Sequence, residues 1–421
     1  MPERYKDKVI SVIGLGYIGL PTAAVFASKR IKVIGLDINE KTVSIINKGK
    51  IHIQEPELDI LVHSTVHEGY LRATLQPEPA DAFLIAVPTP FKDNFEPDLS
   101  YIEAAARSIA PVLRKGNLVI LESTSPIGTT EQMSEWLAQE RPDLSFPHHK
   151  GEASDIRIAH CPERVLPGHI LREIIQNTRI IGGITYKCAE AAAALYKVFV
   201  EGACLLTDTR TAEMCKLIEN SYRDVNIAFA NELSIICDKH KIDVHELIDL
   251  ANYHPRVNIL QPSCGVGGHC VAIDPWFIVH QNPKEAILIK TAREVNNFKP
   301  IWIINKVEEA VGRYLEAHRY KTINEIKIAC FGLAFKPNID DLRESPALQI
   351  TLHLAEKYPN QVIAVEPNID EETKILSKKG IRLVTVDYAL KAAEIIVILV
   401  KHEEFLELDL SEIDWNYIVI S

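Results

Sequence analysis

Three features that often reveal the class of a protein are missing from this sequence: long apolar runs, an excess of positive charge and paired cysteines. No stretch approaches the roughly 18 consecutive apolar residues that cross a bilayer, so no membrane-spanning helix is expected. The 57 Asp and Glu outnumber the 46 Lys and Arg, and the formal net charge is -11. Because nucleic acids and anionic membranes attract positive surfaces, we expect neither as a partner.

The cysteines and the opening segment also exclude several classes. The eight cysteines are scattered without a CxxC pair, which is typical of small buried side chains in a reducing compartment and predicts neither disulfides nor a bound metal. The stretch MPERYKDKVISVIG lacks the apolar core and the small-residue cleavage site of a signal peptide. We therefore expect a cytoplasmic protein.

Length and composition predict more than one folded domain. With 421 residues, of which 47% are hydrophobic and 24% charged, the chain has a globular composition and exceeds what one hydrophobic core usually serves. The first 200 residues alternate short apolar runs with helical segments, which is typical of a parallel β-sheet with crossover helices. The expected strands are Val9–Ile13, Lys32–Leu36, Ala82–Val87, Leu118–Glu122 and Arg157–Cys161.

A glycine-rich turn, Gly14–Gly19 (GLGYIG), separates the first expected strand from an expected helix, Leu20–Ser28. The GxGxxG spacing allows a tight turn, close approach of backbone N–H groups to a pyrophosphate, and close packing of helix on strand. Asp37 ends the next strand, where a carboxylate accepts from ribose hydroxyls and repels a 2′-phosphate. These residues predict a Rossmann-type domain that binds NAD rather than NADP. A glycine-rich turn without a ligand is the alternative.

The middle third is predicted to be helical. No Gly or Pro lies between Asp208 and His254, and residues 211–240 are apolar on more than one face, which suits a helix at a domain junction or a subunit interface. Two further helix starts carry capping signals. They are Asp243 with Glu246, and Asn282-Pro283 with Glu285.

Alternating apolar runs return after residue 325 and predict a second α/β domain. Its first turn, GLAFKPN, lacks the GxGxxG spacing, so we do not expect a second dinucleotide there. The predicted fold class is α/β, with two Rossmann-like, doubly wound domains joined by a central helical region that contains a long helix. The expected strands of the last domain are Ile326–Phe331, Gln361–Val365, Ile395–Val400 and Tyr417–Ile420.

One cysteine has unusual surroundings. The loop Gly265–Cys270 (GVGGHC) places Cys270 after three glycines, with Asp274 one helical turn later. The glycines leave the sulfur approachable, and a thiolate can add to an aldehyde to give a thiohemiacetal that loses a hydride and becomes a thioester. An inert, packed cysteine is the alternative. A Cys/His pair with His269 is disfavoured because adjacent side chains rarely face each other.

Polar side chains form a stripe on the long helix. Lys216, Asn220 and Arg223 stand at i, i+4 and i+7. An ammonium and a carboxamide there could stabilise an oxyanion. A solvated or salt-bridged face is the alternative.

Two cations gather near a helix start in the last domain. Lys336 and Arg343 precede Ser345, the expected N-cap, and Pro346, the expected first helical residue. A helix N-terminus with cations nearby suits a phosphorylated ligand. Pairing of these cations with neighbouring acids is the alternative.

Together these residues resemble the UDP-glucose/GDP-mannose dehydrogenase family, whose members use two NAD to oxidise the C6 alcohol of a nucleotide sugar to a carboxylate. Residues 254–260 with Trp276-Phe277 are most similar to the branch that acts on N-acetylated sugars, so UDP-N-acetyl-D-mannosamine is the expected substrate. The motifs that carry the resemblance occur in the family's order and cover essentially the whole chain. They are GLGYIGLPTA, the PTP turn, STSPIGTT, CPERVLPG, AEMCKLIENSYRDVNIAFANEL, GVGGHCVAIDP and FGLAFKPNIDDLRESP.

The resemblance implies a role for each matching residue. Its catalytic set is Cys270 as nucleophile, Lys216 and Asn220 to stabilise anionic intermediates, with Lys216 also relaying a proton, and Asp274, Thr124 and Glu163 for the water and proton transfers of thioester hydrolysis. The residues expected to hold NAD are Gly14, Gly16, Tyr17, Ile18, Gly19, Asp37, Thr89, Thr130 and Arg343. Those expected to hold the UDP-sugar are Arg164, Val165, Lys216, Asn220, Arg223, His254, Arg256, Gly267, Phe335 and Lys336.

The resemblance also implies an NAD-binding domain over residues 1–205, a central helical dimerisation domain with the cysteine loop over 206–318, and a UDP-sugar-binding domain over 319–421. It implies a homodimer in which Arg256 reaches the neighbouring subunit's site. The chain departs from the family at Ser263-Cys264, where relatives usually have Gly and another small residue or Pro, so the conformation of that loop is open.

Three functional alternatives stay open. The substrate could be UDP-N-acetylglucosamine or UDP-glucose. The chain could be a two-electron dehydrogenase of a phosphorylated hydroxy acid, which would release one NADH and ignore Cys270. It could also be a non-catalytic protein that senses a nucleotide.

Overall fold

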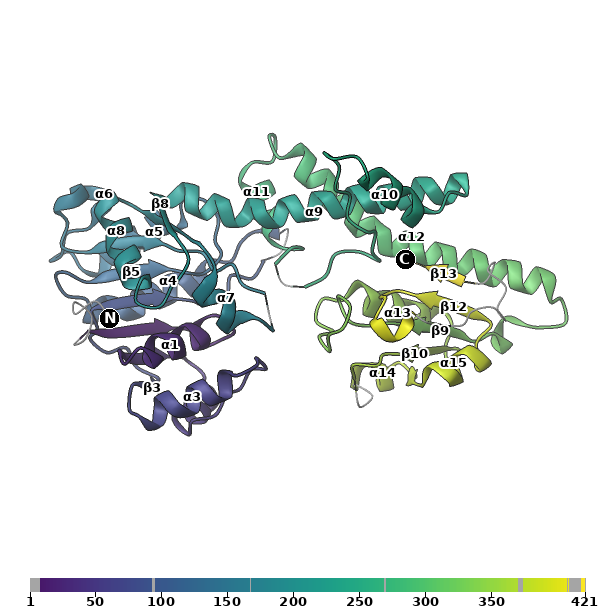
Figure 1. The fold of residues 1–421 in the computed structure, drawn as a ribbon, viewed down its shortest axis with the longest axis horizontal. Helices are drawn as coiled ribbons and strands as arrows, with labels where there is room; N and C mark the ends of the chain where they lie inside the picture. The colour runs from purple at the N-terminus through teal and green to yellow at the C-terminus, as the bar shows by residue number, and fades with distance from the viewer. Residues whose placement is uncertain are drawn as a thin grey trace. The chain divides into compact units, whose positions relative to one another are not determined.

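A computed structural model describes residues 8–92, 95–166, 168–268, 270–369, 374–406, 408 and 418–420. The chain forms two compact units, Met1–Glu219 and Asn220–Ser421, and the division falls inside one long helix, α9 (Thr209–His240). Each unit is an α/β structure of its own (Figure 1), as predicted. Within the described ranges no helix is long and apolar enough to cross a membrane.

The first unit is built on a sheet with the strand order β3-β2-β1-β4-β5-β6-β7-β8 among the described residues. Neighbouring strands are parallel except β6 and β7, which pair antiparallel. The order reverses between β1 and β4, and ligands of open α/β sheets bind at such a reversal. The strands are β1 (Val9–Ile13), β2 (Lys32–Leu36), β3 (Leu71–Thr74), β4 (Ala82–Ile85), β5 (Leu118–Leu121), β6 (Arg157–His160), β7 (Arg179–Gly183) and β8 (Cys204–Asp208).

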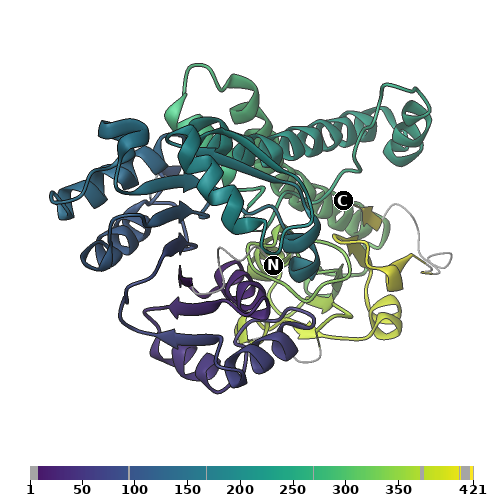
Figure 2. The same cartoon turned by 60° about the vertical axis from the view of Figure 1, so that its left-hand side comes forward.

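Helices cover both faces of this sheet (Figure 2), because alternate residues of each strand point to opposite sides. Leu118 and Ile120 of β5 belong to one apolar core, and Val119 and Leu121 belong to the other. The helices are α1 (Gly19–Ser28), α2 (Glu40–Asn47), α3 (Leu58–His67), α4 (Ser100–Ile109), α5 (Thr129–Glu140), α6 (Pro147–Lys150), α7 (Ile170–Gln176) and α8 (Tyr186–Tyr196), with 3-10 turns η3 (Ala110–Val112) and η4 (Gly151–Ala153).

All five strands predicted for this unit are present, but three others were not predicted. β3 has only four residues, β8 has no fully buried residue, and β7 ends in two glycines, so their hydrophobic patterns are weak. Both glycines are required in β7, since a Cβ at Gly182 would lie 2.5 Å from the Asp208 carbonyl oxygen and one at Gly183 would lie 2.2 Å from the Thr185 carbonyl oxygen.

The second unit begins with helices. They are the remainder of α9, α10 (Val244–Asn252), α11 (Asp274–Gln281) and α12 (Ile287–Ala317). A buried polar network joins α9 to α12: Arg293 forms an ion pair with Asp224 at 2.6 Å, and Asn231 donates to Asn296 at 2.9 Å. This network buries one face of α9 against α12.

One predicted capping signal is confirmed and the other is wrong. The Asp243 side chain caps α10 by accepting from the N–H groups of His245 and Glu246. α12, however, begins only at Ile287 and has no side-chain cap. Asn282 ends the preceding helix instead, since both its backbone N–H and its side-chain amide donate to the Ile278 carbonyl.

The second unit ends in a fully parallel sheet of order β11-β10-β9-β12-β13. Ser345 caps α13 and Pro346 is its first residue, as predicted. Tyr417 lies outside the described residues, and the two-residue β11 was not predicted. The strands are β9 (Ile328–Phe331), β10 (Val362–Val365), β11 (Arg382–Leu383), β12 (Ile395–Ile398) and β13 (Ile418–Ile420); the helices are α13 (Pro346–Lys357), α14 (Lys374–Lys378) and α15 (Val386–Ala392), with 3-10 turns η5 (Ile323–Glu325) and η6 (Glu403–Phe405).

Candidate active site

The glycine-rich turn between β1 and α1 has the geometry of a dinucleotide site. Gly14 has φ +88°, and a Cβ at Gly19 would lie 1.8 Å from the Gly14 carbonyl oxygen, so neither position accepts another residue. A Cβ at Gly16 would meet nothing within 4 Å. The turn is therefore closed on its protein side and open at Gly16, where a pyrophosphate can approach the backbone and the N-terminus of α1.

Asp37 follows β2 and braces this turn. One carboxylate oxygen accepts from the Leu15 N–H at 2.9 Å, and the other accepts from the Asn39 N–H at 2.8 Å. Asp37 is half-buried, so part of its surface is accessible. Within the turn, Tyr17 is exposed and Ile18 is half-buried. These residues fit the adenosine half of NAD, the cofactor expected from the sequence.

Two more predicted residues meet where β4 and β5 end. The Thr89 hydroxyl donates to the Thr124 carbonyl at 2.6 Å, which ties the PTP turn to the STSPIGTT loop. Thr130 is fully buried, and its hydroxyl donates to Glu213 of α9 at 2.6 Å. Glu213 also accepts the N–H groups of Gly128 and Thr130, so it holds the start of α5. Burial raises the pKa of Glu213 to about 7 despite these donors.

Glu163 forms a buried ion pair that the sequence did not predict. Its Oε2 lies 3.2 Å from Nη1 of Arg179, and both side chains are under 9% exposed. Its Oε1 accepts from the Arg164 N–H at 2.7 Å. The Arg179 guanidinium also lies over the Tyr196 ring, 4.7 Å from its centre. Arg179 therefore holds the predicted catalytic carboxylate in one orientation.

A second carboxyl group lies in the same buried cluster. Glu122 directly follows β5, two residues before Thr124, and its Oε1 accepts from the Tyr196 hydroxyl at 2.6 Å. Burial, opposed by the nearby Arg179, raises the pKa of Glu122 to about 7. This cluster is thus able to hold a proton close to neutral pH beneath the loops that follow β5 and β6.

The loop after β6 carries two residues expected to hold the sugar. Arg164 donates to Glu219 of α9 through Nε at 2.9 Å and lies 2.7 Å from it through Nη2, and Val165 beside it is half-buried. The loop is anchored at its far end by Glu55, which accepts the N–H groups of Gly168 at 2.9 Å and Ile170 at 2.7 Å. Glu55 was not singled out from the sequence.

In the second unit, the cysteine loop leads directly into α11. Cys270 is exposed, and its carbonyl accepts the N–H groups of Ile273 at 3.0 Å and Asp274 at 2.9 Å. Asp274 is 3% exposed, and its Oδ2 accepts from the side-chain amide of Asn220 at 2.5 Å. The structure therefore brings three predicted catalytic residues together, an accessible thiol beside a buried amide–carboxylate pair. His269 lies outside the described residues.

Glycines let this loop pack against the loop that follows β9. A Cβ at Gly267 would lie 2.5 Å from the Glu344 carbonyl oxygen and 3.0 Å from Cβ of Phe335. A Cβ at Gly268 would lie 3.3 Å from the Phe335 ring. Phe335, expected to hold the sugar, is thus placed next to the cysteine loop. The glycines serve close packing as well as access to the sulfur.

The unusual Ser263-Cys264 pair has an ordered conformation. The Ser263 N–H donates to Asn231 of α9 at 2.8 Å, and its hydroxyl donates to the Gly265 carbonyl at 2.9 Å. Cys264 is buried, and burial raises the pKa of its thiol to about 12. Cys264 is therefore held as a neutral thiol, whereas Cys270 is exposed.

The remaining predicted residues lie on several elements. Lys216 is half-buried on the part of α9 that belongs to the first unit. Thr124 and Glu163 also belong to the first unit. Arg223, His254 and Arg256 are exposed, and Lys336 is half-buried. Arg343 forms a two-point ion pair with Asp341, with distances of 2.9 and 2.7 Å. For Arg343, pairing with a neighbouring acid is thus observed.

Known proteins share this organisation along the whole chain. Models of the UDP-glucose/GDP-mannose dehydrogenase family match its NAD binding domain at residues 8–200, its central domain at 210–298 and its UDP binding domain at 329–417. A UDP-N-acetyl-D-mannosamine dehydrogenase from Campylobacter jejuni is 65% identical over 400 residues, covering 94% of this chain and 96% of the relative.

Two further relatives agree with this family. An NDP-N-acetyl-D-galactosaminuronic acid dehydrogenase from Ralstonia nicotianae is 60% identical over 414 residues, covering 98% of this chain and 95% of that one. A solved structure of UDP-D-ManNAc dehydrogenase from Pyrococcus horikoshii superposes with a TM-score of 0.84 at 39% identity, covering 97% of this chain and 93% of that chain. The chain belongs to the UDP-glucose/GDP-mannose dehydrogenase family.

Proposed function

We propose that this protein catalyses the NAD-dependent, four-electron oxidation of UDP-N-acetyl-D-mannosamine at C6 to UDP-N-acetyl-D-mannosaminuronate. The observation that carries the proposal is the exposed Cys270, one helical turn from the buried Asp274–Asn220 pair, in a chain of a nucleotide-sugar dehydrogenase family. Relatives named for this reaction are 65% and 39% identical to the chain, which supports the choice of sugar.

The reaction requires a residue that retains the aldehyde between two oxidations. Two hydrides leave C6 in turn, and NAD held at the turn Gly14–Gly19 would supply the acceptor for each of them. After the first, the Cys270 thiolate adds to the aldehyde carbon and forms a thiohemiacetal. Loss of the second hydride leaves a thioester, and water then breaks the C–S bond, giving the carboxylate and returning the thiol. One alcohol, one water and two NAD⁺ thus give one carboxylate, two NADH and three protons.

The polar groups around Cys270 suit the charges that develop in these steps. The Asn220 amide donates to Asp274, so the two side chains hold each other in place beside the loop. We assign Asn220 and Lys216 to the oxyanions of the adducts, where one oriented donor contributes roughly 3 kcal/mol. We assign Asp274, Thr124 and Glu163 to the proton transfers that accompany hydrolysis. Arg179 keeps Glu163 paired and oriented for this task.

We assign cofactor binding to the turn Gly14–Gly19 with Asp37, Thr89 and Arg343. Thr130 is fully buried and bound to Glu213, so we assign it to shaping the start of α5 for the cofactor. Asp37 supports NAD over NADP, because its carboxylate would repel a 2′-phosphate. We assign the UDP-sugar to Arg164, Val165, Arg223, His254, Arg256, Gly267, Phe335 and Lys336. The scattered cysteines support a reducing, cytoplasmic location.

Stoichiometry and a cysteine pair test the proposal. We expect two NADH per UDP-N-acetyl-D-mannosamine consumed, and we expect Cys270→Ala to lower acid formation roughly 10³-fold or more, as loss of a nucleophile does. Cys264→Ala is the matched control, since this buried thiol of the same loop has a pKa raised to about 12 and should leave the rate near that of the unaltered protein.

Other results would identify the alternatives. One NADH per substrate, with Cys270→Ala still active, would indicate a two-electron dehydrogenase. Binding of NAD without turnover would indicate a nucleotide sensor. Faster turnover of UDP-N-acetylglucosamine, UDP-glucose or a galactosamine-derived sugar would reassign the substrate, a choice that the relative from Ralstonia nicotianae makes worth testing.

We also propose that the protein is a homodimer whose interface includes the exposed apolar stripe of α9. Tyr222, Phe229 and Ile236 follow one another at seven-residue spacing and are 72%, 51% and 47% exposed. Such a stripe on a surface helix favours burial against another copy. Arg256 is exposed beyond α10 and is assigned to the neighbouring site.

Complementation tests this assembly. Cys270→Ala and Arg256→Ala subunits should each be inactive alone. Coexpressed in equal amounts, they should regain about a quarter of the full activity, because half of the dimers are mixed and each mixed dimer has one intact site. Absence of any recovery in a mixture that sediments as a dimer would contradict the role of Arg256. Sedimentation as a monomer would contradict the dimer.

A further inference from the structure

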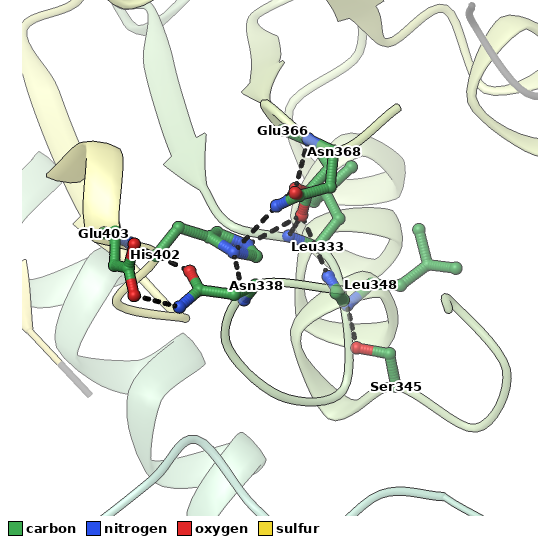
Figure 3. Close-up of polar contacts among 9 residues, drawn as sticks. Leu333, Asn338, Ser345, Leu348, Glu366, Asn368, His402 and Glu403 are labelled. Atoms are coloured by element: carbon green, nitrogen blue, oxygen red, sulfur yellow. Dashed lines mark hydrogen bonds and ion pairs between the residues drawn. The ribbon is translucent and has the colours of Figure 1, made fainter. Parts of the chain in front are cut away.

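A buried histidine–glutamate pair lies at the carboxyl end of the second sheet (Figure 3). His402 follows β12 and is 0% exposed, and Glu366 follows β10 and is 3% exposed. Nε2 of His402 lies 3.0 Å from Oε2 of Glu366, and Nδ1 lies 2.9 Å from the Asn338 backbone nitrogen. Because a backbone N–H can only donate, Nδ1 must accept, and the ring proton resides on Nε2 and is donated to Glu366.

This pair fixes both ends of one short segment. At the start, Glu366 Oε2 accepts the N–H groups of Leu333 at 2.7 Å and Ala334 at 3.1 Å. At the end, Asn338 donates its N–H to His402 and has φ +60°, a left-handed conformation that asparagine tolerates. Its side chain exchanges two hydrogen bonds of 3.0 Å with Glu403. The residues between, 335–337, therefore have little conformational freedom.

The fixed segment carries the two side chains assigned to the nucleotide sugar. Phe335 and Lys336 are half-buried, and the Lys336 ammonium lies 5.8 Å from the centre of the Phe335 ring. The Phe335 ring packs against Gly268 of the cysteine loop. A change in the backbone of this segment would displace a ring next to the catalytic loop and a cation next to the ring.

We propose that His402 is a positioning residue for substrate binding: by accepting the Asn338 N–H while donating to Glu366, it holds the backbone in the form that presents Phe335 and Lys336. The inference rests on the proposed function, which assigns those two side chains to the UDP-sugar. Without the hydrogen bonds of His402, part of the free energy of substrate binding would be used to order residues 335–337. His402 therefore improves substrate affinity by ordering these residues in advance. Asn368 supports it, since its side-chain amide lies 3.0 Å from Nδ1.

Three substitutions separate the two halves of the bridge. His402→Asn keeps an oxygen near the place of Nδ1 and can still accept from Asn338. His402→Gln reaches toward Glu366 but offers no acceptor at that place, and His402→Phe offers neither group. We expect the Gln and Phe variants to raise KM for UDP-N-acetyl-D-mannosamine, and the inhibition constant of UDP, about tenfold, the loss expected for one buried hydrogen bond.

The pattern across measurements distinguishes positioning from a general structural role. In the Gln and Phe variants, kcat and KM for NAD should change less than about twofold. Contacts that hold the sugar nucleotide equally well in the ground state and in the transition state affect only the KM for the sugar nucleotide. His402→Asn should stay within about threefold of the unaltered protein in every constant. His353→Phe, an exposed histidine of α13, is the matched control and should change nothing.

Specific results would overturn the inference or its foundation. Equal KM values for the Asn, Gln and Phe variants, or a parallel rise of KM for NAD, would refute a positioning role for His402. Lys336→Ala tests the proposed function separately. If it leaves KM for the sugar unchanged, the assignment of Lys336 fails, whereas a raised KM in Lys336→Ala with a normal KM in His402→Phe contradicts only the positioning role.

Discussion

The two sheets place an acidic residue at the same topological point and use it differently. Asp37 follows β2, Glu366 follows β10, and each accepts backbone N–H groups from the turn after the neighbouring strand, β1 or β9. The residue two positions later is an asparagine in both, and its N–H donates back to the acid, at 2.8 Å in Asn39 and 3.1 Å in Asn368. The same arrangement of acid, turn and asparagine therefore occurs in both sheets.

The two sheets differ in the residues that surround this arrangement. Glu366 is 3% exposed and receives further donors from His402 and the Asn368 side chain, whereas Asp37 is half-buried. The first turn is open at Gly16, while Ala334 in the second turn is fully buried. The same topology thus gives two results. The first turn, with Gly16 and an accessible acid, leaves room for a dinucleotide, whereas the second turn, with a buried alanine and a buried acid, is filled by protein atoms.

Replacing each acid by its amide should sharpen this comparison most. Glu366→Gln turns one oxygen into an NH₂ group that faces donors, and we expect it to lower the free energy of unfolding by about 3 kcal/mol. Asp37→Asn should cost less than about 1 kcal/mol, because solvent can satisfy a half-buried amide, but it should weaken discrimination against NADP. Urea titration and KM for NAD and NADP measure the two effects. Equal destabilisation by both variants would contradict the comparison.

Glu366→Gln should also change how the stability of the protein depends on pH. Burial alone would raise the pKa of Glu366, but hydrogen bonds from His402 and from the N–H groups of Leu333 and Asn368 outweigh it and lower the pKa. A carboxyl group with a lowered folded-state pKa contributes stability above its unfolded pKa and loses it as pH falls. The unaltered protein should therefore lose stability toward acid more steeply than Glu366→Gln does. Parallel acid unfolding curves would show that Glu366 is not held as a carboxylate.

Local patterns made much of this molecule predictable. The turn Gly14–Gly19 and Asp37 could be assigned because the strand, turn, helix and acid lie within about one βαβ unit of sequence. The caps Asp243 and Ser345 could be assigned because each side chain binds N–H groups two or three residues ahead. In each case the interacting groups are close in sequence, so spacing alone specifies the contact.

Long-range contacts could not be predicted in the same way. Glu55 anchors Gly168, 113 residues away, and Glu213 holds Thr130, 83 residues away. Arg179 reaches Glu163 across paired strands, and nothing in a single sequence indicates which buried acid it meets. Asn282 shows a different limit, since a side chain suited to start one helix ended the previous one. A sequence pattern thus predicts a helix or a strand, whereas tertiary packing determines which side chains meet.

The two asparagines offer the smallest test of the comparison, because their backbone roles match and their side chains do not. Asn39 caps α2 by accepting from the N–H groups of Lys41 and Thr42, so Asn39→Ala should cost about 1 kcal/mol and increase hydrogen exchange at the start of α2. Asn368→Ala removes one donor from Glu366 and one from His402, each of which keeps other partners, and should cost less than Asn39→Ala. A larger loss for Asn368→Ala would mean that the closed turn depends on its side-chain network more than the open turn depends on its helix cap.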